Sequence, residues 1–160
     1  MNISDVEGIG KTMDAMAQYE MLLADLYETC AEAWPDDRDF WMDIARQEVQ
    51  HAENLRMMKA LVSREPARFD KGRPLNPVAV NTAINGLKEI IRKLSAGEYA
   101  YERLLIVARD IENAVLEAHY PDIVKTSNVE YQTLLNAIMS ETRDHSRHIQ
   151  QKLADVKAKV

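Results

Sequence analysis

A carboxylate and a histidine interrupt an apolar helical stripe in the segment 46–55, which reads RQEVQHAENL. Intervals of three and four residues alternate along this stripe, which is the spacing of the buried face of a packed helix. Glu48 and His51 lie three residues apart and therefore one turn apart on that face. The whole stripe is Trp41, Ile44, Glu48, His51, Leu55, Met58 and Val62. Because an unpaired buried carboxylate is very costly, we expect a partner to neutralise Glu48, and Glu-x-x-His in a bundle core suggests a metal ion.

The segment before this one shows the same spacing over about residues 4–33. Its stripe has Glu20 as the single charge: Met13, Met16, Glu20, Leu23, Tyr27, Cys30 and Trp34. Pro35 should end this helix, and Asp36 or Asp37 can cap the next one, which we expect over about 37–63. Because the connection is short, the two helices should form an antiparallel hairpin.

The second half of the chain repeats this plan. A helix over about 98–119 carries Glu112 on its stripe, and a helix over about 129–156 carries Glu141 and His145, four residues apart on one face. Two such hairpins packed antiparallel bring six side chains to one depth of a four-helix core, as in di-iron carboxylate proteins. These candidate ligands are Glu20, Glu48, His51, Glu112, Glu141 and His145.

The connection between the halves is long. Residues 65–77 contain three prolines and a glycine and read as a crossover loop, and Asn76-Pro77 is a helix start signal for a short helix over about 78–94. Ser95-Ala96-Gly97 then marks a break, and 121–128 a second loop. The fold class expected is all-α: one domain over 1–160, an antiparallel four-helix bundle whose long crossover contains a short extra helix.

Bulk properties exclude several function classes. The formal charge is −6 and the sequence has no clustered basic face, which argues against nucleic-acid binding. No apolar run approaches the roughly 18 residues of a membrane span, and the N-terminus lacks the basic and apolar regions of a secretory signal. The single cysteine, Cys30, excludes an intrachain disulfide and a Cys-x-x-Cys site, so we expect a reducing cytoplasm and a buried apolar role for Cys30.

Four short motifs carry a family resemblance. They are Glu20 with Tyr27 seven residues on, RQEVQHA at 46–52, ARDIEN at 108–113 and SETRDH at 140–145. With them the chain resembles the ferritin-like superfamily, and most closely its rubrerythrin-like branch, from about residue 13 to 149. The resemblance implies a ferritin-like four-helix bundle, a carboxylate-bridged di-iron centre, and a homodimer or larger assembly.

The resemblance also implies roles for the ligands. Glu48 and Glu112 would bridge the two irons, Glu20 and Glu141 would be terminal carboxylates, and one histidine would serve each metal: His51 and His145. The seam neighbours Tyr27 and His119 would stand close to the ligands or line an access route. Iron is the expected metal, with zinc or manganese as alternatives.

Three features depart from the rubrerythrin pattern. Thr142 occupies the place of the second box's carboxylate, with Glu141 one residue earlier. Val115 occupies the place of an additional glutamate tied to peroxidase chemistry. A rubredoxin module needs four cysteines, and this chain has one, so electrons would come from a separate donor protein.

Three functions therefore compete. The first is a redox enzyme that reduces H2O2 or O2, or oxidises Fe(II), with Glu20, Glu48, His51, Glu112 and His145 as its working residues. The second is a metal-binding or iron-handling bundle without turnover, which the Thr142 and Val115 departures would fit. The third is a structural or interaction module that has lost the site. A lone Glu-x-x-His is more often a solvated pair, but its seam position and its repetition in the second half favour a metal centre.

Overall fold

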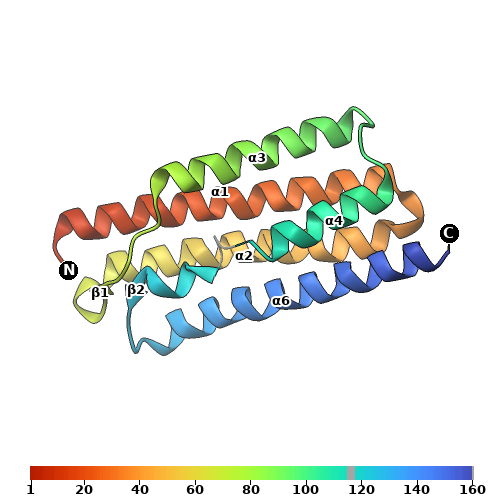
Figure 1. Cartoon of the computed structure of the whole chain (residues 1–160). Helices are drawn as coiled ribbons and strands as arrows, with labels where there is room; N and C mark the ends of the chain where they lie inside the picture. Colours follow the sequence, from red (N-terminus) through yellow and green to blue (C-terminus); the bar gives the residue numbers. More distant parts are fainter. Residues whose placement is uncertain (115–117, 160) are drawn as a thin grey trace.

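Long helices make up nearly all of the computed structural model, which describes residues 1–114 and 118–159 (Figure 1). The all-α prediction is confirmed. The α-helices that lie wholly within the described residues are α1 (Ile3–Ala33), α2 (Arg38–Arg64), α3 (Pro77–Ser95), α4 (Tyr101–Glu112) and α6 (Val129–Ala158). Short 3₁₀ turns are η1 (Pro35–Asp37), η2 (Pro66–Arg68) and η3 (Tyr120–Asp122).

Helices α1, α2, α4 and α6 surround the interior, and α3 lies against the outside of α1 (Figure 1). α1 and α6 run in one direction, whereas α2 and α4 run in the other. α1 packs most extensively on α2, and α6 packs on both α4 and α2. The crossover from α2 through α3 therefore carries the chain back to the end of the bundle where α4 begins.

Asparagine side chains cap several helix starts, as the sequence indicated for Asn76. Asn76 Oδ1 accepts a hydrogen bond from the Val78 N–H, and Asn2 and Asn128 cap α1 and α6 in the same way. Asp37 stands at the start of α2, but its side chain makes no capping bond. The expected role of Asp37 as a cap is therefore wrong, because its carboxylate binds Tyr101 and Lys152 instead.

The helix predicted over 98–119 is shorter than expected. Gly97, at φ +74°, ends α3 with the left-handed residue that favours glycine, and α4 begins only at Tyr101. α4 ends at Glu112, where Asn113 leaves the helical path and accepts a hydrogen bond from Ser146 on α6. Asparagine favours such non-helical positions because its side chain competes for local hydrogen bonds. Val115 lies outside the described residues.

Two short strands tie the loops together at one end of the bundle. β1 (Asp70–Lys71) pairs antiparallel with β2 (Val124–Lys125), which sequence patterning did not predict. Next to them, the Gly72 N–H donates to the Ile123 carbonyl at 2.9 Å. A Cβ on Gly72 would lie 2.0 Å from the Asp122 carbonyl oxygen, so this close approach requires glycine.

The predicted stripes of α1 and α2 face the core. From Met13 to Cys30 and from Trp41 to Val62, every stripe residue is buried, and Cys30 is fully so. No helix among the described residues is long and apolar enough to cross a membrane. Because Glu20, Glu48 and His51 lie on these stripes, the core contains carboxylates and an imidazole that the surrounding side chains must accommodate.

Candidate metal centre

Five of the six predicted ligands meet inside the bundle. Glu20 comes from α1, Glu48 and His51 from α2, Glu112 from the last turn of α4 and His145 from α6. None is more than 5% exposed. Since Glu, Asp, Lys and Arg are almost never fully buried unless paired, three carboxylates at this depth point to a functional cluster.

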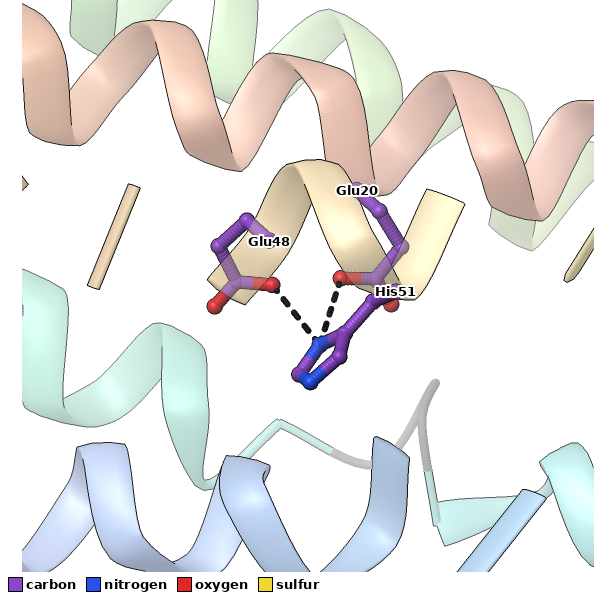
Figure 2. Close-up of side chains that lie close together, drawn as sticks. All are labelled: Glu20, Glu48 and His51. Atoms are coloured by element: carbon purple, nitrogen blue, oxygen red, sulfur yellow. Dashed lines mark hydrogen bonds and ion pairs between the residues drawn. The ribbon is translucent and has the colours of Figure 1, made fainter. Parts of the chain in front are cut away.

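The first group consists of Glu20, Glu48 and His51, which point toward one another in Figure 2. Nδ1 of His51 lies 3.1 Å from Oε2 of Glu48 and 3.7 Å from Oε2 of Glu20. One ligand atom from each residue lies within 4.8 Å of the others. An ion between these atoms would therefore have two carboxylates and one imidazole nitrogen as ligands.

The second group consists of Glu48, Glu112 and His145. Nδ1 of His145 lies 2.8 Å from Oε1 of Glu48 and 3.7 Å from Oε2 of Glu112. This arrangement repeats the first group with the other carboxylate oxygen of Glu48. Glu48 thus stands between the two groups, with one oxygen directed to each histidine.

The two groups are related by an approximate two-fold arrangement. The imidazole rings of His51 and His145 are nearly parallel, with centroids 5.7 Å apart and planes 25° apart. Oε2 of Glu112 lies 3.7 Å from Nδ1 of His145, and Oε2 of Glu20 lies at the same distance from Nδ1 of His51. Glu112 therefore belongs to one group and mirrors Glu20, whereas the family resemblance paired it with Glu48 as a bridging residue.

Burial and mutual repulsion set the protonation of the carboxylates. Burial, reinforced by the charge of Glu48, raises the pKa of Glu20 to about 8 and that of Glu112 to about 7. Burial also disfavours ionised Glu48, but bonds from both histidines outweigh it and hold the Glu48 pKa well below its usual range. Glu48 is therefore the carboxylate that stays ionised.

The histidines hold protons for the same reason. Burial alone would lower the pKa of His51, but Glu20 and Glu48 outweigh it and raise that pKa to about 11. Burial is likewise outweighed at His145, where Glu112 and Glu48 raise the pKa to about 9. Without a metal, protons supply the positive charge that the buried carboxylates need.

Several ligand atoms have unused hydrogen-bonding capacity. Within the described parts of the chain, four buried atoms of the cluster have no hydrogen bond of good geometry: Glu20 Oε2, Glu48 Oε1, Glu112 Oε2 and His145 Nδ1. Two of them, His145 Nδ1 and Glu48 Oε1, meet as an ion pair at 2.8 Å. Buried polar atoms are nearly always satisfied, and exceptions commonly mark an ion or a functional group. These atoms are also the ones by which the two groups face inward, so the donor set fits a pair of cations.

The sixth predicted ligand, Glu141, lies in neither group. Its carboxylate accepts a hydrogen bond from Nε2 of His51 at 2.8 Å, on the side of the ring away from Glu20 and Glu48. Its side chain is 34% exposed, unlike the five buried residues. This position is the one from which a carboxylate orients a metal-binding histidine.

Gln47 holds the corresponding position on the other histidine, and sequence reasoning missed it. Nε2 of His145 donates a hydrogen bond to Oε1 of Gln47 at 2.5 Å. Gln47 precedes His51 by four residues and Glu141 precedes His145 by four, so each outer residue reaches across the α2–α6 interface to the histidine of the other helix. Aligning the two boxes on their histidines would have revealed this match.

The same alignment places Thr142 opposite Glu48. Thr142 is buried, at 7% exposed, and its hydroxyl makes no hydrogen bond within the described residues. The repeat therefore supplies a shared carboxylate from α2 and a hydroxyl from α6.

Two tyrosines hold the outer carboxylates. The Tyr27 hydroxyl donates a short hydrogen bond to Oε1 of Glu112, and the Tyr120 hydroxyl donates to Oε1 of Glu20 at 3.0 Å. Tyr27 is thus close to the site, as expected, although it serves the carboxylate of α4. Tyr120 was not anticipated. His119 is partly exposed and lies 3.6 Å from Asp122.

A groove of about 740 Å³ runs between α2 and α6. Its lining includes Gln47 and Glu141, the two residues that hold the far nitrogens of the histidines. Gln47 and Glu141 therefore lie between this groove and the two histidines of the buried centre.

Comparisons with models of protein families, with curated proteins and with solved structures found no match to this chain. Two buried Glu/His groups that share one carboxylate can hold metal ions at two adjacent positions.

Proposed function

We propose that the protein binds two metal ions, most readily iron, at Glu20, Glu48, His51, Glu112 and His145, and uses them as a redox centre of the rubrerythrin-like kind. The observation that carries this proposal is the position of Glu48, whose two oxygens face two separate Glu/His sets. A surface pair or a structural ion pair would need only one such set.

The donor set supports this class of metal. Carboxylate and imidazole ligands suit iron, manganese and zinc, while the absence of a thiolate from either group disfavours softer ions. Three carboxylates offset much of the charge of two divalent ions, in a site where protons otherwise do so. When bound, two iron ions would supply two electrons to H2O2 or O2, or accept them from Fe(II).

The chain's own residues prepare this chemistry. Glu141 and Gln47 hold the far ring nitrogens of His51 and His145, so that the two Nδ1 atoms face the metal positions. Tyr27 and Tyr120 fix the carboxylates of Glu112 and Glu20. Such outer contacts typically change metal affinity or activity by about 10- to 100-fold.

A second candidate function is metal binding without turnover. Thr142 favours it, because a hydroxyl stands where the approximate two-fold relation would place a second shared carboxylate. This candidate predicts tight metal binding with no reaction of the Fe(II) form with peroxide.

We further propose a separate protein as electron donor and a homodimer in the reducing cytoplasm, both carried over from the family resemblance. Size-exclusion chromatography with light scattering tests the dimer.

Metal content and a chelation melt test the main proposal. We expect about two metals per chain after reconstitution with Fe(II), and a clear loss of melting temperature on chelation, because a ligand of the folded state stabilises it. Stopped-flow mixing of the Fe(II) protein with H2O2 then separates a redox centre from a storage site. An unchanged melt and no bound metal would overturn the proposal in both forms.

A further inference from the structure

A continuous line of aromatic side chains leads away from the metal centre. It begins at Tyr27, whose hydroxyl donates to Glu112. The Tyr27 ring stacks on Trp41, with centroids 5.6 Å apart and planes 18° apart. Both residues are fully buried. One of the two tyrosines that contact the site therefore also contacts a tryptophan directly.

The line continues from Trp41 to the end of the bundle where α1 turns into α2. The Trp41 indole N–H donates to the Tyr101 hydroxyl at 3.2 Å, and the two rings are 6.4 Å apart. Tyr101 stacks on Trp34 with centroids 4.5 Å apart. Tyr101 and Trp34 are only partly buried, so the line ends where solvent reaches it.

We propose that these four side chains, the aromatic path, carry single electrons between the metal centre and the surface at the α1–α2 turn: Tyr27, Trp41, Tyr101 and Trp34. The inference rests on the proposed redox function of the centre. Electron transfer slows steeply with distance, and each step along this path joins rings in contact or joined by a hydrogen bond. Both tryptophans of the chain lie on it.

Each phenol on the aromatic path has a carboxylate that can take its proton. Tyr27 donates to Oε1 of Glu112, and Tyr101 donates to Oδ2 of Asp37 at 2.5 Å. Asp37 also pairs with Lys152 at 2.9 Å. Burial opposes ionisation of Asp37, but Tyr101 and Lys152 outweigh it and lower its pKa, so the carboxylate is ionised at neutral pH, with Oδ2 in place to receive the Tyr101 proton.

The electrons and protons balance along this route. After the centre has been oxidised by H2O2 or O2, Tyr27 gives it one electron and shifts its phenolic proton to Oε1 of Glu112, which is ionised once a bound metal has displaced its own proton. Trp41 then reduces Tyr27, which takes its proton back. Tyr101 reduces Trp41 and shifts its own proton to Asp37, until a one-electron reductant at the surface, directly or through Trp34, restores Tyr101 and the proton returns. The net result is one electron moved from the reductant to the centre.

The first test uses metal-free protein and therefore does not depend on the proposed function. A photogenerated ruthenium(III) tris-bipyridine oxidant, confined to solution, should oxidise the partly exposed end and then the buried Tyr27, which peptide mass spectrometry detects. In Trp41→Phe, which keeps an aromatic ring in the core, oxidation of Tyr27 should fall at least tenfold while Trp34 is still oxidised. The matched control, Tyr131→Phe, removes a buried tyrosine that packs on Phe69 away from the aromatic path and should behave as wild type.

The second test starts from the metal. Iron-loaded protein mixed with H2O2 and a nitroso spin trap should give adducts on Trp34 or Tyr101, and the yield of these adducts should fall at least tenfold in Trp41→Phe.

In the first test, equal oxidation of Tyr27 in wild type and Trp41→Phe, or no oxidation of Tyr27 in wild type, would overturn the aromatic path. So would a wild-type centre that consumes peroxide yet gives no adduct at the exit. Oxidation of Tyr27 through Trp41 in the first test, with no reaction of the iron-loaded protein with peroxide, would instead overturn the redox function but still support electron transfer along the aromatic path.

Discussion

Glu141 on α6 accepts a hydrogen bond from Nε2 of His51 on α2, at 2.8 Å and across the helix interface. The same relation holds between Gln47 and His145 in the opposite direction. Each histidine is therefore held by the helix that carries the other one. These two hydrogen bonds connect the Glu/His segments of α2 and α6, so substitution of an outer residue on one helix should change metal affinity at the histidine of the other helix.

Replacing Glu141 by Gln should weaken metal binding without removing a metal. An amide can still accept from His51 but cannot offset the charge of the imidazole and metal, so we expect a loss of about 10- to 100-fold in affinity at the first position. Competition with a chromogenic chelator measures it. Gln47→Glu serves as the matched control, because it adds the charge at the equivalent place. A drop to one metal per chain in Glu141→Gln would show instead that Glu141 is itself a ligand.

Replacing Glu48 by Ala should have the largest effect on metal content. Its two oxygens serve both groups, so we expect binding at one position to be abolished and the other to be weakened. Metal analysis by mass spectrometry gives the stoichiometry. Retention of two metals per chain would contradict the assignment of Glu48 as the shared ligand.

Thr142→Ala is the comparison for that variant, from the equivalent position on α6. Since its hydroxyl makes no hydrogen bond within the described residues, its loss should change the unfolding free energy by no more than about 1 kcal/mol. Metal stoichiometry should stay at the wild-type value. A large loss of metal in this variant would mean that Thr142 organises the second box.

The protonation of the cluster predicts how the metal-free fold responds to pH. Glu20, Glu112, His51 and His145 all have pKa values raised above their ordinary values, to between about 7 and 11. The folded state therefore binds more protons than the unfolded chain, and stability must fall as pH rises through this range. Glu48, with its lowered pKa, acts in the opposite sense only at acidic pH. Thermal melts of the chelated protein at increasing pH should show this decline above neutrality.

Metal affinity should depend on pH in the opposite direction from the stability of the metal-free fold, which provides the control. Ligand protons on Glu20, His51 and His145 must leave before the metal binds, so affinity should rise with pH, by about tenfold per unit for each proton released. Calorimetry in buffers of different ionisation enthalpy counts these protons. Metal affinity independent of pH would place the metal elsewhere.

The buried stripes were predictable because helical periodicity records which side faces the core, and Glu20, Glu48 and His51 stand on those stripes. The position of Glu141 was harder to predict. Intervals of three and four residues both keep a side chain on one helix face, so spacing alone does not tell whether a carboxylate reaches the metal side or the far side of a histidine. That distinction depends on how α2 and α6 are offset, which is a property of packing.

The pairing of short segments that lie far apart in the chain could not be predicted from the sequence either. β1 and β2 have two residues each, too few to show the alternation of a strand. The end of α4 at Glu112 was not predicted either, and the hydrogen bond from Ser146 of α6 to Asn113 at this point joins residues that are far apart in the sequence. Tyr120 likewise reaches Glu20 from a distant part of the chain, a 3₁₀ turn that carries no periodic signal.

The strand pair suggests a last prediction, at Gly72. A Cβ at this position would lie 2.0 Å from the Asp122 carbonyl oxygen and 2.9 Å from the Ile123 carbonyl. These are backbone atoms, so Gly72→Ala must push the two loops apart and lose hydrogen bonds that include Arg73 N–H to Asp122 at 2.7 Å. We expect a loss of unfolding free energy on the order of 2 kcal/mol, measured by urea denaturation.

Gly86→Ala is the control for this substitution. Gly86 lies on the exposed face of α3 with nothing within 4 Å of the added methyl, so alanine should stabilise the helix by about 0.5–1 kcal/mol. Because Ile123 and Tyr120 belong to the same loop, loosening it should also weaken the Tyr120–Glu20 bond at the metal centre. Metal affinity should therefore fall in Gly72→Ala but not in Gly86→Ala, and equal stability in the two variants would show that the strand pair does not hold this loop.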